Sequence, residues 1–529
     1  MPSRLPRAAR RLAAVAALVL SPLVGCERTP APPPRSGPVD VAAKAERERA
    51  PATITLLYTT DEHGWLQPVA EEGKVKGGAA QVLALWIAEE GHCPGLPADG
   101  SAAPGPIPAA CKDPATLALS GGDNWTGPAL SSYFQGAPMA EAMRRMGYAA
   151  SAFGNHEFDF GRDAFLQNRA RARLPYLAAN LRVRGPGLQA LEIPPFVIFE
   201  RRGVRIGVIG LATQETLRTA MASRFEGIEF LEEEEALERA VPEAWRAEPD
   251  AVVLIAHECP DKLAPILDRH PEWGLSFVGG GHCHKQSNAK VGDALLVNPS
   301  WRLRSYARVR LEIDPRRPLR RRVVSTSAEI VDVAPAEGAP AAPPDEPIAR
   351  SIAAWQARLD EALGETIGYS DGMERGSTEI GQWIGAAWRD ELGVDMALLN
   401  KGGIRQAVPR GPVTKATIYS VLPFDNKLLI CSLKGSDVLQ LIGHAETVLA
   451  GLSPAGGGRY VLGDGKPFEE ARRYTVATID FLYFGGDGFG FQAQDPNPSW
   501  TGLDWRAPVI SWTKAMGTSP NLPLERLVR

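Results

Sequence analysis

Apolar residues recur along this chain in short runs, with segments of helical spacing between them. The first run, Ile54–Tyr58, is β-branched or aromatic in character and ends in polar residues, which is typical of a strand. Helical spacing follows at Gly78–Glu90 and Met139–Met146. Alternating strands and helices predict an α/β sandwich with functional groups on the loops at strand ends. Further predicted strands are Leu117–Leu119, Val204–Ile209, Ala251–Ile255 and Leu275–Val278.

Two segments rich in proline and alanine, Thr29–Pro51 and Val333–Pro347, interrupt this pattern. Because 529 residues exceed one ordinary core, we expect two domains with export and linker segments. The predicted boundaries are a signal peptide at 1–25, a tether at 26–51, a first domain at 52–332, a linker with a connecting helix at 333–363, and a second domain at 364–529.

The first residues predict export. Four arginines in the first eleven residues precede the apolar run Leu12–Leu20, which is too short to span a bilayer. Leu23–Cys26 resembles a bacterial lipobox, which implies acylation of Cys26 and a periplasmic or cell-surface protein anchored to the membrane. The alternative is an ordinary signal peptide in which Cys26 is incidental.

The remaining cysteines fit an exported protein with disulfides. Cys93 and Cys111 flank a loop rich in glycine, proline and alanine and are the favoured pair; Cys259 with Cys283 is a second candidate, and Cys431 reads as a buried strand thiol. The net charge of −4 gives no electrostatic reason to expect a nucleic acid polymer as a partner.

The positions of the histidines are the main chemical signal. The chain has eight, and five of them follow predicted strands among carboxylates, carboxamides and glycines. A lone loop histidine is more often solvated or hydrogen-bonded than a ligand, but five in this setting indicate a metal centre. These five are His63, His156, His257, His282 and His284.

The segments around them are, in chain order, Asp61-Glu-His63, Gly122-Asp123, Gly154-Asn-His-Glu157, His257 and Gly281-His-Cys-His284. In this order they resemble the motifs of the calcineurin-like metallophosphoesterases, over about residues 54–333. The resemblance implies a four-layer αββα sandwich.

The resemblance also implies a site for two divalent metal ions. One ion takes Asp61, His63, Asp123 and His284; the other takes Asp123, Asn155, His257 and His282, so Asp123 bridges. Mixed oxygen and nitrogen ligands suit Zn, Mn, Fe or Co, and the sequence does not choose among them. Two such ions neutralise phosphoryl oxygens and activate a water as the nucleophile.

His156, which follows ligand Asn155, is by the same resemblance a catalytic residue rather than a ligand. It would donate a hydrogen bond or proton to the phosphoryl oxygen or leaving group, with Asp159 orienting its ring; a purely structural role is the alternative. The family often has a small hydroxyl residue where this chain has Cys283. In an extended segment Cys283 points away from the ligand side, so we do not count it as a ligand.

The C-terminal part resembles the 5′-nucleotidase C-terminal domain, a smaller α/β unit, over about residues 348–490. Its matching segments are Asn400–Arg405, Leu422–Phe424 and Phe481–Phe489. The resemblance implies that two aromatic rings clamp a nucleobase, although phenylalanines also serve as core residues. The substrate-binding residues carried over are Asn400, Gly402, Gly403, Arg405, Phe424, Phe481, Asp487 and Arg375, with Arg375 displaced by one position from the family pattern.

These features together predict a metal-dependent phosphoester hydrolase that removes phosphate from 5′-nucleotides, with UDP-sugars and cyclic nucleotides as further substrates to consider. Two alternatives remain. One is a hydrolase of sulfur esters related to the sulfur-oxidation thiosulfohydrolases, which share the two-domain plan. The other is a relative that binds its ligand without catalysis.

Overall fold

The computed structural model describes residues 49–71, 74–95, 111, 114–185, 188–334 and 343–528. The predicted signal peptide, most of the tether and Cys26 lie outside the described residues. Within the described part of the chain, no helix has both the length and the apolar character that a membrane crossing requires.

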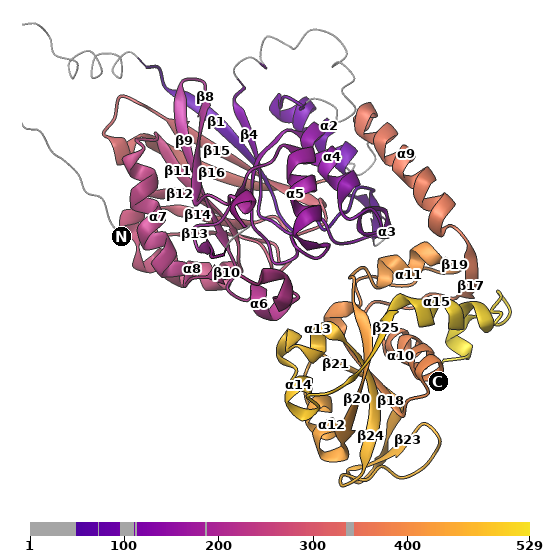
Figure 1. Cartoon of the computed structure of the whole chain (residues 1–529). Coiled ribbons are helices and arrows are strands. Elements are labelled where there is room, and N and C mark those ends of the chain that lie inside the picture. Colours follow the sequence, from indigo (N-terminus) through magenta and orange to yellow (C-terminus); the bar gives the residue numbers. More distant parts are fainter. Residues whose placement is uncertain are drawn as a thin grey trace, which may run out of the picture. The chain divides into compact units, whose positions relative to one another are not determined.

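Two six-stranded sheets form the N-terminal part (Figure 1). In both sheets the central strands are parallel to one another; antiparallel pairs lie at one edge of the first sheet and at both edges of the second. The first sheet has the order β16 (Val323–Asp332), β15 (Ser305–Ile313), β1 (Ala52–Thr59), β4 (Thr116–Ser120), β5 (Tyr148–Ala152), β6 (Tyr176–Leu177). The second has the order β13 (Ser287–Val291), β14 (Ala294–Asn298), β12 (Leu275–Gly279), β11 (Ala251–His257), β9 (Val204–Ala212), β8 (Phe196–Arg201).

The two sheets pack face to face, and helices cover their outer faces. Side chains of both sheets, such as Leu56 and Val253, share one buried cluster between them. Apolar residues from α2 (Ala79–Glu90), α4 (Ala137–Met146) and α5 (Gly161–Ala172) pack in the cluster outside the first sheet. Those from α7 (Glu233–Arg246) and α8 (Pro260–Arg269) pack outside the second. The predicted four-layer αββα sandwich is therefore confirmed.

A separate core forms around a five-stranded sheet in the C-terminal part. Helices α10 (Thr378–Leu392) and α15 (Arg506–Ala515) pack against each other and contribute to it. The sheet order is β21 (Thr447–Ala450), β18 (Met396–Asn400), β24 (Arg473–Ile479), β20 (Lys427–Lys434), β25 (Ser499–Asp504). The predicted smaller α/β unit is thus present, while its boundary at residue 364 stays a prediction.

The connecting helix α9 (Glu346–Leu363) packs against the N-terminal part. Ile348, Leu359 and Leu363 are buried in the same cluster as α2 and α4. Asp345 caps the helix by accepting a hydrogen bond from Ile348 N and also pairs with Arg145 at 2.9 Å. This helix is therefore held by the first core rather than spanning solvent.

Both candidate disulfides are formed. Cys93 pairs with Cys111, and Cys259 pairs with Cys283. Cys431 is an unpaired, buried thiol on β20, as its strand pattern indicated.

A buried histidine outside the candidate site makes the fold sensitive to acid. His92 Nε2 donates to the Met146 carbonyl at 2.8 Å, and Nδ1 lies 2.9 Å from the Thr116 hydroxyl. Burial lowers the pKa of His92 to about 4. The unfolded chain therefore binds a proton here at a pH where the native chain does not, so stability is lost as pH falls from about 6.5 towards 4.

We expect this residue to contribute about 2 kcal/mol to the loss of stability between pH 7 and pH 5. Urea unfolding of the metal-free protein at the two pH values would measure the loss. In His92→Gln, whose side chain does not titrate, the loss should be smaller by that amount. An identical pH slope in the variant would contradict the assignment.

Candidate metal centre and substrate cavity

The predicted ligands lie at the ends of strands from both sheets. Asp61 and His63 follow β1, Asp123 follows β4 and Asn155 follows β5, while His257 is the last residue of β11. His282 and His284 follow β12. Because these strands are parallel to one another within each sheet, their carboxyl ends meet at one edge, where side chains distant in sequence converge.

Asp61, His63 and His284 form the first ligand group. His63 Nε2 lies 3.1 Å from His284 Nε2, and His284 Nε2 lies 3.3 Å from an Asp61 carboxylate oxygen. His63 Nδ1 donates to the Thr126 carbonyl at 3.0 Å, so its proton is used there and Nε2 presents an electron pair to the group. This arrangement suits a cation.

Asp123 and His257 form the second compact ligand group together with Asp61, and the Asn155 amide oxygen adjoins it. His257 Nδ1 donates to the Gly121 carbonyl at 2.9 Å. Its Nε2 faces the Asn155 amide oxygen at 3.0 Å and an Asp123 oxygen at 3.2 Å. Burial opposes the charged form of His257, but Asp123 raises its pKa to about 10, so without a cation the Nε2 proton pairs with Asp123. A metal ion would take the place of that proton between the same atoms.

Asp123 stands between the two groups. The same carboxylate oxygen that faces His257 lies 3.8 Å from His63 Nε2 of the first group. The other oxygen accepts a hydrogen bond from His156 N at 2.8 Å. This position supports a bridging role for Asp123.

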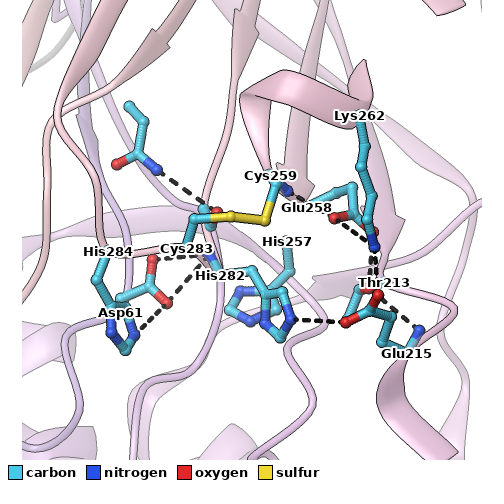
Figure 2. Close-up of a disulfide and its surroundings, with 12 residues drawn as sticks. Asp61, Thr213, Glu215, His257, Glu258, Cys259, Lys262, His282, Cys283 and His284 are labelled. Atoms are coloured by element: carbon cyan, nitrogen blue, oxygen red, sulfur yellow. Dashed lines mark hydrogen bonds and ion pairs between the residues drawn. A yellow bond between two sulfur atoms is a disulfide. The ribbon is translucent and has the colours of Figure 1, made fainter. Parts of the chain in front are cut away.

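His282 is placed differently from the other predicted ligands. Its ring lies 5.2 Å from that of His257, but its Nε2 is 3.7 Å from a carboxylate oxygen of Glu215, and among the described residues it joins no compact group of ligand atoms (Figure 2). Its backbone N–H donates to the Asp61 carboxylate. Sequence reasoning missed Glu215, although Thr213–Glu215 is a polar segment after the buried strand β9 and could have been noticed.

The backbone of the ligand loops is strained. Five of the predicted ligands have positive φ angles between 45° and 66°, a region that non-glycine residues rarely adopt. Each such residue costs of order 1 kcal/mol or more, so the surrounding contacts must hold it. The five are Asp61, His63, Asp123, His282 and His284.

Buried polar residues beneath the ligands supply those contacts. Glu62 accepts hydrogen bonds from the Ser120 hydroxyl at 2.9 Å and the Asn124 amide at 2.7 Å. Glu157 accepts from the backbone N–H groups of Asp123 and Asn124 at 2.7 and 3.3 Å. Burial raises the pKa of Glu62 to about 7. These acids lie next to predicted ligands in the sequence, yet only the structure shows that they fix the loops.

His156 and Asp159 form the expected pair. His156 Nδ1 lies 2.8 Å from an Asp159 carboxylate oxygen, so Asp159 orients the ring. Burial opposes the charged form, but Asp159 and Asp123 together raise the pKa of His156 above its usual value. The ring also stacks on Phe424, with centroids 5.4 Å apart.

A second aromatic residue supports the first ligand group. The indole of Trp301 stacks on the ring of His284, with centroids 4.2 Å apart and planes 12° apart. The Arg302 guanidinium lies over Trp301 at 3.5 Å and over Trp65 at 4.4 Å. Arg302 also donates to the Arg405 carbonyl, which links this stack to the C-terminal part. Nothing in the spacing around Trp301 had indicated this role.

One cavity of about 200 Å³ joins the ligand groups to the C-terminal signature residues. From the N-terminal part it is lined by Asp123, Asn155, His156, Asp159, His282 and His284. From the C-terminal part it is lined by Asn400, Gly402, Gly403, Arg405, Phe424, Phe481 and Asp487. Thr219, Met221 and Arg224, which the sequence did not indicate, complete one wall.

Arg405 brings a positive charge to the metal side of this cavity. Its Nη2 lies 3.4 Å from His63 Nε2, and burial, together with Arg375, lowers its pKa to about 10. Arg375 itself is not among the described residues that line the cavity. Its Nε donates to the Ile404 carbonyl at 3.1 Å, and its guanidinium lies 5.8 Å from the Trp301 ring.

Phe424 and Phe481 are both half-buried and pack on the C-terminal core. A side chain at Gly486 would come within 2.4 Å of the Phe481 ring, so glycine at this turn makes room for it. The Asn400 amide donates to the Asp487 carboxylate at 2.7 Å, while its own oxygen is buried and has no hydrogen-bond partner among the described residues. Asn400 and Asp487 both line the cavity.

Gly154 leads to a direct test of the ligand geometry. A Cβ at this position would lie 2.2 Å from an Asp123 carboxylate oxygen and 2.4 Å from Asp123 N. We expect Gly154→Ala to displace Asp123 and to lower both bound metal and hydrolytic activity at least tenfold. Metal analysis and phosphate release would measure this.

Gly490→Ala is the matched control, because a Cβ there meets nothing within 4 Å and Gly490 does not have a positive φ. Equal behaviour of the two variants would show that the approach of Gly154 to Asp123 has no consequence.

Comparison with known proteins matches the C-terminal part to a family model and most of the chain to curated relatives. Residues 359–459 match the family model described as 5′-nucleotidase, C-terminal domain. Protein UshA of Escherichia coli is 25% identical, over 82% of this chain and 86% of its own length. A 5′-nucleotidase of Vibrio cholerae is 24% identical over 90% of each chain.

Solved structures share the fold. A 5′-nucleotidase precursor from Thermus thermophilus superposes with a TM-score of 0.72 at 24% identity, covering 88% of this chain and 97% of its own. A sulfate thiohydrolase SoxB from the same species superposes with a TM-score of 0.66 at 19% identity, covering 88% and 94%. At this identity the two likenesses concern the fold alone.

Proposed function

We propose that this chain, which is similar to 5′-nucleotidases over most of its length, is a metal-dependent phosphoester hydrolase that removes phosphate from 5′-nucleotides. The observation that carries the proposal is one cavity lined together by predicted metal ligands, by Arg405 and by the rings of Phe424 and Phe481. Such a cavity suits a substrate with a phosphate and an aromatic base.

The two ligand groups would hold two divalent cations, with Asp123 shared between them. Zn, Mn, Fe and Co all suit this mixture of carboxylate, amide and imidazole ligands. When bound, the cations neutralise charge on the phosphoryl oxygens and lower the pKa of a coordinated water. We assign His282 to the second cation, which requires its ring to turn from Glu215 towards His257.

The remaining catalytic and substrate-binding roles belong to side chains of the protein. Asp159 holds the Nδ1 proton of His156, so His156 Nε2 is free to serve the phosphoryl oxygen or the leaving group. Arg405 adds positive charge near the transferred group. The rings of Phe424 and Phe481 would stack on the base, and Asp487 and Asn400 would bind the ribose hydroxyls and the base. Gly402 and Gly403 leave room for these contacts, while Arg375 acts through the Ile404 backbone.

We also propose export, with lipidation at Cys26. The lipobox-like sequence at Leu23–Cys26 supports the anchor, and the two disulfides are of the kind found in oxidising compartments.

Phosphate release from AMP, with metal analysis, tests the proposed activity. We expect the purified protein to release phosphate, to lose at least 90% of that activity with a chelator, and to regain it on adding Mn²⁺ or Zn²⁺. Parallel assays use UDP-glucose, a cyclic nucleotide and S-sulfocysteine. Release of sulfate from S-sulfocysteine without release of phosphate from AMP would favour the sulfur-ester alternative. Bound metal without hydrolysis of any of these substrates would favour a binding protein.

The aromatic clamp makes a separate prediction. Stacking contributes about 1–3 kcal/mol per base, so Phe481→Ala should raise KM for AMP about tenfold or more. Phe424→Ala should raise this KM equally and also lower kcat for every substrate, because the Phe424 ring stacks on His156. The KM for p-nitrophenyl phosphate should change little in either variant. Phe468→Ala is the control, because Phe468 also packs on the C-terminal core but stacks on Tyr474 outside the cavity. An equal increase in KM for both substrates would refute the aromatic clamp.

A further inference from the structure

The disulfide Cys259–Cys283 lies next to the proposed metal centre. Cys259 comes two residues after His257, and Cys283 stands between His282 and His284. The bond therefore joins the two loops that carry three of the predicted ligands. Figure 2 shows it beside the rings of His257 and His282.

The strand arrangement explains why these loops can be joined. β11 and β12 are adjacent parallel strands, with Ile255 paired to Gly279, so the loops leave the same edge of the sheet. The Cα atoms of the two cysteines lie 5.3 Å apart. Cys283 thus pairs with the neighbouring loop, although its segment is not extended as expected, because His282 and His284 have positive φ angles.

Restraint at this loop has a clear use. His282 and His284, on either side of Cys283, both have left-handed backbones, with φ angles of 66° and 58°. The loop is otherwise held by backbone bonds, including Gly281 N to the Glu258 carbonyl at 3.0 Å and Cys283 N to the Gly281 carbonyl at 2.7 Å. A covalent link to Cys259 limits the conformations open to both histidines when no cation is bound.

Accessibility makes this link sensitive to its surroundings. Both cysteines are partly exposed, and the adjoining His282 and His284 line the substrate cavity. The free thiol Cys431 is buried on β20 of the C-terminal sheet. An exchange reaction with an external dithiol can thus reach Cys259–Cys283 without unfolding of the core.

We propose that Cys259–Cys283 is a positioning disulfide that couples the redox state of the protein to its retention of metal; the proposal rests on the proposed metal-dependent function. In the oxidised chain the bond holds His257, His282 and His284 ready to bind. A dithiol reduces it by breaking the S–S bond: two electrons and two protons pass to Cys259 and Cys283, and the dithiol becomes its own disulfide. The reduced loops hold the metal more weakly.

Binding of Mn²⁺ measured by electron paramagnetic resonance tests this without relying on activity. Mn²⁺ is suited to the test because it prefers oxygen and imidazole ligands over newly formed thiols. We expect both dithiol-reduced wild-type protein and the Cys259→Ser/Cys283→Ser variant to bind Mn²⁺ at least tenfold more weakly. Reoxidation should restore the wild type, and excess Mn²⁺ should restore kcat with little change in KM for AMP.

The Cys93→Ser/Cys111→Ser variant is the control, since it removes a disulfide that contains no predicted ligand. It should keep its Mn²⁺ affinity when oxidised and lose it on reduction. Urea unfolding of all variants verifies that they are folded.

Each other outcome counts against the proposal. Unchanged Mn²⁺ affinity after reduction, with four new thiols counted by Ellman's reagent, overturns it even if the double variant binds weakly. AMP hydrolysis in the oxidised protein then shows that the proposed function stands alone. If the oxidised protein neither binds Mn²⁺ nor hydrolyses AMP, the proposed function and this inference both fall.

Discussion

The buried carboxylate of Asp123 is the interaction on which the site depends. It lies at the end of β4, only 2% exposed, and contacts His257, His63 and the backbone of His156. A buried anion is costly unless it is paired, and its partners come from both sheets. The packing of the two sheets therefore brings together the charges that make the site chemically useful.

Strain in the ligand loops follows from the same requirement. To direct several side chains at so small a volume, the backbone takes left-handed turns at residues that do not favour them. Glu62, Glu157 and Asn124 offset this cost by binding the loops from below. Such hydrogen bonds hold the strained ligand residues in their binding geometry before a cation binds.

Much of this architecture could be predicted from the sequence. The apolar runs at Ile54–Tyr58 and Ala251–Ile255 became β1 and β11 because short β-rich runs have few other buried conformations. Two long strands were not predicted. β16 is an edge strand of half-exposed and exposed, partly polar residues, so its apolar pattern is weak. β15 does alternate between buried and exposed residues in its second half, and that alternation could have predicted it. The order of the motifs along the chain likewise identified candidate metal ligands that the fold brings together.

Contacts made across the fold could not be read in this way. Glu215 and Trp301 lie beside ligands only because β9 and the segment after β14 end at the same edge as β12. The pairing of Asn400 with Asp487 depends equally on the adjacency of β18 and β24. Residues far apart in sequence carry no local signal of such meetings, because tertiary packing creates them.

Because α9 packs on the N-terminal core, it limits where the protein can be truncated. Ile348, Leu359 and Leu363 of α9 cover an apolar surface of the N-terminal part. Without α9 that surface would be exposed to water. A fragment that stopped at residue 332 would carry that bare surface and tend to aggregate. The sandwich should therefore be exchanged between proteins only together with α9, which completes its apolar surface.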